Sequence, residues 1–174
     1  MKYQRGFTIV ELILVIVIIG ILAAVVGPRF FDNRDFDERF YFEEVLSAVR
    51  YAQKLAVASG CYIQVSRGSE SQKFLLHRNV NCDNESANSH DFSGVITGVD
   101  GQNYSDASKI SNIPKGLVVE TTPKPFTLIF GPLGCIPDKA PGTCAPKESN
   151  RSVKIGNQFA FTVHAATGFI EVDQ

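Results

Sequence analysis

The sequence lacks the short motifs that carry most enzyme chemistry. It has no Gly-x-Ser-x-Gly elbow, no Walker loop and no glycine-rich dinucleotide loop. No Cys-x-x-Cys pair occurs, and no two histidines stand at a spacing that suits metal ligands. The histidines are isolated, as ordinary surface or core histidines usually are: His77, His90 and His164. We therefore expect no enzymatic activity, no catalytic residue, no metal site and no cofactor.

A basic excess is also missing. The chain has 17 lysines and arginines against 18 aspartates and glutamates. Proteins that bind nucleic acid usually carry an excess of basic residues, so we expect no nucleic-acid partner. Capture of DNA would require one basic face, which would have to be formed by Lys139, Lys147, Arg151 and Lys154.

What the sequence does have is one long apolar run near its start. Within residues 9–26 only Glu11 and Gly20 interrupt a series of isoleucine, valine, leucine and alanine. A helix of about 18 such residues is close in length to the thickness of a bilayer core. Lys2 and Arg5 precede the run, and positive charge favours the cytoplasmic side. We predict one membrane-spanning helix, with the N-terminus in the cytoplasm and the rest of the chain outside.

The order of leader and apolar run differs from that of a secretory signal. A signal peptide places small residues for cleavage after its apolar segment, but here the run ends without such a site, in Val26-Gly27-Pro28-Arg29-Phe30. The short basic leader instead ends at Gly6, before the run. If a protease cuts after Gly6, the hydrophobic helix stays in the mature protein.

The segment Arg5-Gly6-Phe7-Thr8-Ile9-Val10-Glu11, followed by an apolar helix, resembles the N-terminus of type IV pilins and their pseudopilin relatives. The resemblance implies a prepilin leader at residues 1–6 and a transmembrane and assembly helix at residues 7–28. It also implies that residues 29–174 form an extracytoplasmic, pilin-like domain.

Processing and assembly follow from the same resemblance. Prepilin peptidase would cut between Gly6 and Phe7 and methylate the new amine of Phe7. The other expected partners are further pilin subunits and the inner-membrane assembly machinery. The protein would be held in the inner membrane by a single span before it joins a pilus at the cell surface.

Glu11 is the one charge inside the apolar run. A charge well inside a bilayer costs about 2.5 to 3.5 kcal/mol on insertion scales, so Glu11 either snorkels to the nearby helix end or has a function. Under the pilin resemblance, its carboxylate can pair with the Phe7 amine of a neighbouring subunit. In a low dielectric such a pair would fix the axial register of the two subunits.

Beyond the apolar run, the pattern predicts an amphipathic helical half and then strands. An apolar stripe at three- and four-residue spacing runs from Phe42 to Ala56, Gly60 is a natural stop signal, and Pro28 can kink the helix. Period-two segments follow at 62–66, 73–77, 117–120, 126–130, 152–155, 159–164 and 169–172. We predict an α+β fold in which a long N-terminal helix packs on an antiparallel β-sheet. Residues 83–112 hold either a short strand near Val95-Ile96 or a surface loop.

All four cysteines lie in the part of the chain predicted to be outside, where disulfides persist. Four cysteines allow three pairings. We favour the two local pairs, Cys61 with Cys82 and Cys135 with Cys144, because each joins a strand end to a neighbouring loop. Closing each loop stabilises the fold by roughly 3 kcal/mol in the chain-entropy model.

The domain carries a narrower resemblance. The block from Val49 to Val57 and the terminal strands through Thr167-Gly168-Phe169-Ile170 are similar to minor pilins and minor pseudopilins of the GspH/FimT type. Within that type, the block and the Gly60-Cys61 pair most resemble a minor pilin of the mannose-sensitive haemagglutinin (MSHA) pilus. This implies a minor structural subunit that contributes to pilus biogenesis and adhesion. The alternative is a minor pseudopilin of a type II secretion system.

Overall fold

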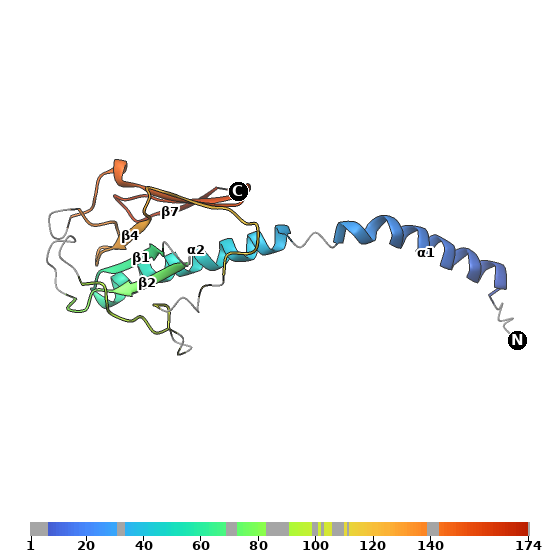
Figure 1. Cartoon of the computed structure of the whole chain (residues 1–174), viewed down its shortest axis with the longest axis horizontal. Helices are drawn as coiled ribbons and strands as arrows, with labels where there is room; N and C mark the ends of the chain where they lie inside the picture. Colours follow the sequence, from blue (N-terminus) through green and yellow to red (C-terminus); the bar gives the residue numbers. More distant parts are fainter. Residues whose placement is uncertain are drawn as a thin grey trace, which may run out of the picture. The chain divides into compact units, whose positions relative to one another are not determined.

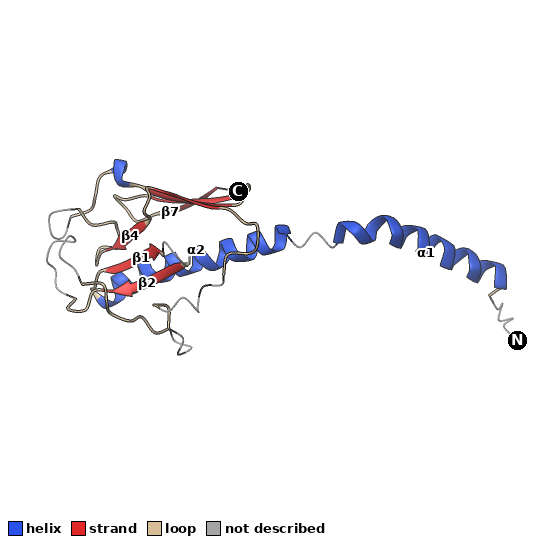
Figure 2. Cartoon of the chain, viewed as in Figure 1, coloured by secondary structure: helices blue, strands red, loops and turns tan. Residues whose placement is uncertain are grey.

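The computed structural model describes residues 7–30, 34–68, 73–82, 91–98, 101, 103–105, 110, 112–138 and 143–173. The chain divides into two compact units, Met1–Phe36 and Asp37–Gln174. Figure 1 labels most of the helices and strands, and Figure 2 colours all of them by type.

The first unit contains helix α1, Ile9–Phe30, which covers the apolar run. Thr8 caps its start, because the Thr8 hydroxyl accepts a hydrogen bond of 3.3 Å from the backbone N–H of Glu11. Among the residues that the structure describes, no helix is both long and apolar enough to cross a membrane. The membrane-spanning segment at residues 7–28 stays a prediction.

Helix α2, Arg34–Ser59, is the long helix of the domain. One of its faces is fully covered by the sheets and carries Tyr41, Phe42, Val45, Leu46, Val49, Ala52 and Ala56. The helix ends at Gly60, which adopts a positive φ of 70° and donates its N–H to the Ala56 carbonyl at 3.0 Å. The predicted amphipathic stripe and its stop signal are confirmed. Residues 31–33, between α1 and α2, lie outside the described part of the chain.

The strands of the described part of the chain form two antiparallel sheets (Figure 2). The first has the order β2-β1-β4 and consists of β1 Ile63–Arg67, β2 Phe74–Arg78 and β4 Thr127–Phe130. The second has the order β3-β5-β6-β7 and consists of β3 Val119–Thr122, β5 Arg151–Ile155, β6 Phe159–Val163 and β7 Ile170–Asp173. The predicted α+β fold is therefore confirmed, although the strands form two sheets and not one.

The hairpin between β5 and β6 is held to the start of α2. Its turn runs from Gly156 to Gln158, as the sequence predicts. The Glu38 carboxylate accepts hydrogen bonds from the backbone N–H groups of Asn157 at 3.1 Å and Gln158 at 3.3 Å. A Cβ at Gly156 would lie 2.1 Å from that carboxylate and would displace the Glu38 side chain, and the positive φ of 60° at this position itself favours glycine.

The segment near Val95-Ile96 contains isolated bridges rather than a strand. Within the described residues, Arg78 bridges to Gly94 and Thr97 bridges to Asn103. Ile96 lies between these bridges and is only 3% exposed, so it anchors the segment to the core. Much of the predicted loop, including residues 83–90, lies outside the described part of the chain.

A single hydrophobic cluster joins α2 to both sheets. The Phe42 ring of α2 stacks on Phe159 with centroids 5.1 Å apart and also contacts Phe161 of β6. Phe74 of β2 meets Phe126 edge to face at 5.8 Å. Aromatic pairs of these geometries add about 0.5 to 1.5 kcal/mol each beyond the area that they bury.

Candidate functional site

Of the predicted processing and assembly residues, the structure describes Phe7, just before α1, and Glu11, in its first turn. Phe7 is 78% exposed, and Glu11 is exposed in the first turn of the helix. Gly6 lies outside the described residues. A carboxylate in the first turn of a helix is favoured by the unpaired N–H groups there. The pairing of Glu11 with a Phe7 amine of another subunit stays a prediction, because it involves a second chain.

The rest of α1 is apolar on every side. Its described large side chains from Ile9 to Leu22 are 42% to 77% exposed, and Glu11 is the only ionisable group among residues 9–22. A helix that is hydrophobic all round is stable only when lipid or other helices surround it. This surface is therefore suited to an apolar environment outside its own domain.

Two disulfides cross-link segments of the domain. Cys61, just after α2, is joined to Cys82, which follows β2, with Cα atoms 4.4 Å apart. Cys135 is joined to Cys144 with Cα atoms 5.7 Å apart. These are the two pairs that the sequence analysis favours.

An amide on α2 ties two loops together, and nothing in the sequence singles it out. The Gln53 Nε2 group donates to the carbonyl of Gly134 at 2.8 Å and to the carbonyl of Gly168 at 2.7 Å. A Cβ at Gly168 would lie 1.8 Å from the Gly134 carbonyl oxygen. The close approach of the two loops, and hence the Gln53 bridge, depends on glycine at this position.

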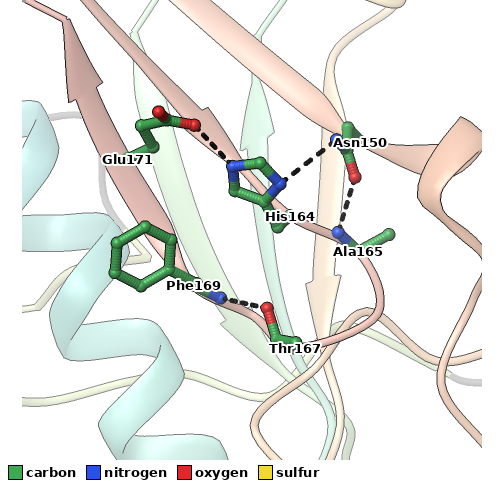
Figure 3. Close-up of polar contacts among 6 residues, drawn as sticks. All are labelled: Asn150, His164, Ala165, Thr167, Phe169 and Glu171. Atoms are coloured by element: carbon green, nitrogen blue, oxygen red, sulfur yellow. Dashed lines mark hydrogen bonds and ion pairs between the residues drawn. The ribbon is translucent and has the colours of Figure 1, made fainter.

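The histidine that sequence reasoning set aside belongs to a small polar cluster, shown in Figure 3. The His164 Nε2 atom lies 2.7 Å from a Glu171 carboxylate oxygen. Asn150 Oδ1 accepts from the backbone N–H of Ala165 at 2.8 Å, so its Nδ2 group faces His164 Nδ1 at 3.5 Å as a donor. Neutral His164 therefore carries its proton on Nε2 and donates it to Glu171.

The described histidines do not form a catalytic or metal-binding group. His77 is on β2 in the first sheet, where burial lowers its pKa, whereas His164 follows β6 in the second sheet. His90 lies outside the described residues. Among the residues that the structure describes, no group of three or more histidine, cysteine, aspartate or glutamate side chains could hold a metal ion.

DNA capture would need a basic face that includes Arg151, but the side chain of Arg151 is engaged within the domain. The Arg151 guanidinium donates to the backbone carbonyls of Thr127 and Ser149, and burial lowers its pKa. Lys154 is exposed but lies directly opposite Glu120 in the pairing of β3 with β5. Lys139 lies outside the described residues. These contacts count against a DNA-binding face.

Known proteins match the N-terminal segment of the chain and the fold of its domain. Residues 1–27 match the prokaryotic N-terminal methylation motif. The type IV narrow pilus major component PilA5 of Thermus thermophilus is 46% identical over 52 residues, which are 30% of this chain and 45% of that protein. A fimbrial protein of Pseudomonas aeruginosa is 38% identical over 60 residues, which are 34% of this chain and 39% of that protein. This chain thus spans less than half the length of these relatives.

The domain resembles a solved pilin structure. The type IV minor pilin FimU of Pseudomonas aeruginosa superposes with a TM-score of 0.51 at 13% identity, covering 82% of this chain and 92% of FimU. At that identity the likeness shows the fold. None of these matches bears on the narrower resemblance to MSHA pilins, which stays a prediction. The chain thus has an N-terminal methylation motif and, in its domain, the fold of a solved type IV minor pilin.

Proposed function

We propose that the chain is a minor structural subunit of a type IV pilus, assembled through α1. The observation that carries this proposal is the position of the methylation motif: it ends inside a helix that is apolar on every side. Cleavage between Gly6 and Phe7 leaves Phe7 as the new N-terminus, and its amine is the atom to be methylated. The apolar surface then passes from lipid to the helices of neighbouring subunits.

Before assembly, α1 holds the protein in the inner membrane with its N-terminus in the cytoplasm. The disulfide-bearing domain faces outward, where disulfides are stable. Prepilin peptidase and the inner-membrane assembly machinery act on this form. In the pilus, the domain lies at the cell surface, where it contributes to biogenesis and adhesion.

Glu11 sets the register of each subunit. Glu11 follows Phe7 by four residues, in the first turn of α1, so the cut places an amine and a carboxylate near the same end of the helix in every subunit. When α1 of one subunit slides along another, a wrong register leaves both charges unpaired in apolar surroundings. Removing one partner of a buried ion pair costs about 3 to 5 kcal/mol, which is enough to select one register.

Mass spectrometry of protein recovered from sheared filaments tests the proposal. We expect the cut after Gly6, one methyl group on Phe7, and both disulfides intact. Glu11→Ala should be inserted and cleaved normally but be strongly depleted from filaments. Glu148→Ala, which changes an exposed carboxylate on the domain, is the matched control. Normal incorporation of Glu11→Ala would contradict the assigned role.

Deletion of the chain separates this function from that of a minor pseudopilin. Loss or shortening of pili supports the pilus subunit. Loss of enzyme export with intact pili would instead support a subunit of a type II secretion system.

A further inference from the structure

The two sulfurs of the Cys61–Cys82 disulfide differ in their exposure. Cys61 directly follows Gly60 at the end of α2 and is only 4% exposed, whereas Cys82 follows β2 and is half-buried. In thiol–disulfide exchange a thiolate attacks one sulfur of a disulfide, so the rate depends on access to that sulfur. Access therefore favours attack at Cys82.

A cation lies beside the more accessible sulfur. The Arg78 guanidinium, at the end of β2, donates to Cys82 Sγ at 3.4 Å. A neighbouring arginine stabilises a cysteine thiolate, which is both the attacking and the leaving form in exchange. When the disulfide is open, Arg78 thus favours the charged form of Cys82.

The surroundings of Cys61 favour its neutral thiol. Cys61 lies two residues beyond Ser59, the last residue of α2, and the negative end of a helix dipole opposes a negative charge there. The last turn of α2 contains no basic residue that would offset this effect. Each sulfur also lies 3.6 Å from one backbone carbonyl oxygen, that of Ser59 for Cys61 and that of Asn79 for Cys82, so this contact does not distinguish the two. Burial, the helix dipole and the guanidinium all favour a thiolate at Cys82 over one at Cys61.

We propose that Cys82 is the entry sulfur of this disulfide: an external disulfide that forms the bond, or an external thiol that reduces it, is first joined to Cys82. In formation, the Cys82 thiolate attacks an external disulfide RSSR, which gives a mixed disulfide on Cys82 and releases one RS⁻. Cys61 then loses its proton to water and attacks Cys82 Sγ, which closes the native bond and releases the second RS⁻. Two protein thiols are oxidised and one external disulfide is reduced.

Reduction passes through the same mixed disulfide in the opposite order. An external RS⁻ attacks Cys82 Sγ and expels the Cys61 thiolate, and a second RS⁻ then releases the Cys82 thiolate as RSSR forms. These steps depend only on contacts within the domain, so they hold whether or not the chain enters a pilus.

Mass spectrometry of the full chain in detergent, with both disulfides intact, identifies the entry sulfur. Mercaptoethanol is added to the native wild type, and iodoacetamide then blocks every free thiol. We expect molecules that carry mercaptoethanol on Cys82 and a carbamidomethyl group on Cys61. Mercaptoethanol on Cys61, or equal amounts on the two cysteines, would overturn the proposal.

Two cysteine variants measure the same difference in the direction of oxidation. Cys61→Ser leaves Cys82 free and Cys82→Ser leaves Cys61 free, while the Cys135–Cys144 disulfide is present in both. With hydroxyethyl disulfide near neutral pH, Cys82 should form the mixed disulfide at least about tenfold faster than Cys61. In concentrated guanidinium chloride the two rates should become similar, because only the folded domain makes the two cysteines unlike. Similar rates in the native variants, or a difference that persists in denaturant, would contradict the proposal.

The role of Arg78 is tested in the Cys61→Ser variant. Hydroxyethyl disulfide is neutral, so Arg78 cannot act by attracting it. Arg78→Met should lower the rate at Cys82 about threefold, because a neighbouring cation raises the thiolate fraction about tenfold and lowers its intrinsic nucleophilicity about threefold. Arg78→Lys keeps the positive charge and should retain most of the rate.

Arg39→Met, also in the Cys61→Ser variant, is the matched control for the loss of a positive charge. Arg39 lies near the start of α2, roughly 30 Å along the helix from Ser59, and its loss should leave the rate at Cys82 unchanged. Equal rates for Arg78→Met and Arg39→Met would show that the guanidinium does not stabilise the Cys82 thiolate.

Discussion

Arg67 of β1 donates a hydrogen bond of 2.8 Å to the backbone carbonyl of Val119, which belongs to β3 in the other sheet. A reciprocal contact runs the opposite way, since Arg151 of β5 donates to the carbonyl of Thr127 in β4 at 3.2 Å. Each guanidinium thus donates a hydrogen bond to a backbone carbonyl on a strand of the other sheet. Within the described part of the chain the two sheets share no paired strands, and the two arginines join them.

Arg67→Met should lower the free energy of unfolding by about 1 to 3 kcal/mol, because the carbonyl of the buried Val119 would lose the guanidinium donor. Arg39→Met is a suitable control, since Arg39 is exposed on α2. Denaturant unfolding of the full chain in detergent, with disulfides intact, measures both. Equal stability of the two variants would show that the arginine does not join the sheets.

Gly168→Ala should destabilise the domain by about 3 kcal/mol or more. The added Cβ would meet the Gly134 carbonyl at 1.8 Å, and the residue has a positive φ of 69°. Gly116→Ala separates the two effects, because Gly116 also has a positive φ, 86°, but has open space around it. There we expect only the conformational cost of about 1 kcal/mol. Similar melting temperatures for the two variants would contradict the close approach of the loops.

Tyr41 makes stability depend on alkaline pH. Its side chain is fully buried, its hydroxyl has no hydrogen-bond partner among the described residues, and burial raises its pKa to about 12. In the unfolded chain tyrosine ionises near pH 10, so the stabilising contribution is complete below pH 10 and is lost as the pH rises through about 12. Relative to Tyr41→Phe, the wild type should lose roughly 1 to 2 kcal/mol between these values. A constant difference across this range would exclude the effect.

The sequence predicts which faces are buried better than it predicts which strands pair. Period-two alternation identifies β1 and β4 as strands, but the same alternation is compatible with any neighbour. In the structure β1 pairs with β4 across the 59 intervening residues 68–126, whereas β3 skips β4 and pairs with β5. A single sheet was predicted because the alternation of apolar and polar residues does not indicate which strands pair.

Some features of the candidate site can likewise be predicted from the sequence, and others cannot. The N-terminal motif and the local disulfides can be predicted, because contiguous residues or short separations define them. The Gln53 bridge cannot be predicted, because its acceptors are the backbone carbonyls of two glycines and every residue has such a carbonyl.

The cluster around His164 makes a prediction about a single proton. Asn150 is oriented by the Ala165 N–H, so its amide nitrogen faces His164 Nδ1 and Nε2 is left to donate to Glu171. Nitrogen-15 NMR of neutral His164 should therefore show almost only the Nε2–H tautomer.

Asn150→Ala removes the group that orients the ring, and a detectable share of the Nδ1–H form should then appear. Asn157→Ala is the control, because Asn157 contributes only its backbone N–H to a hydrogen bond with Glu38 and should leave the tautomer unchanged. The proton on Nδ1 in the wild type would mean that Asn150 is turned the other way, and the Ala165 N–H would then face an amide nitrogen. Because that arrangement opposes two donors, the Nε2–H tautomer is the one that satisfies every group in the cluster.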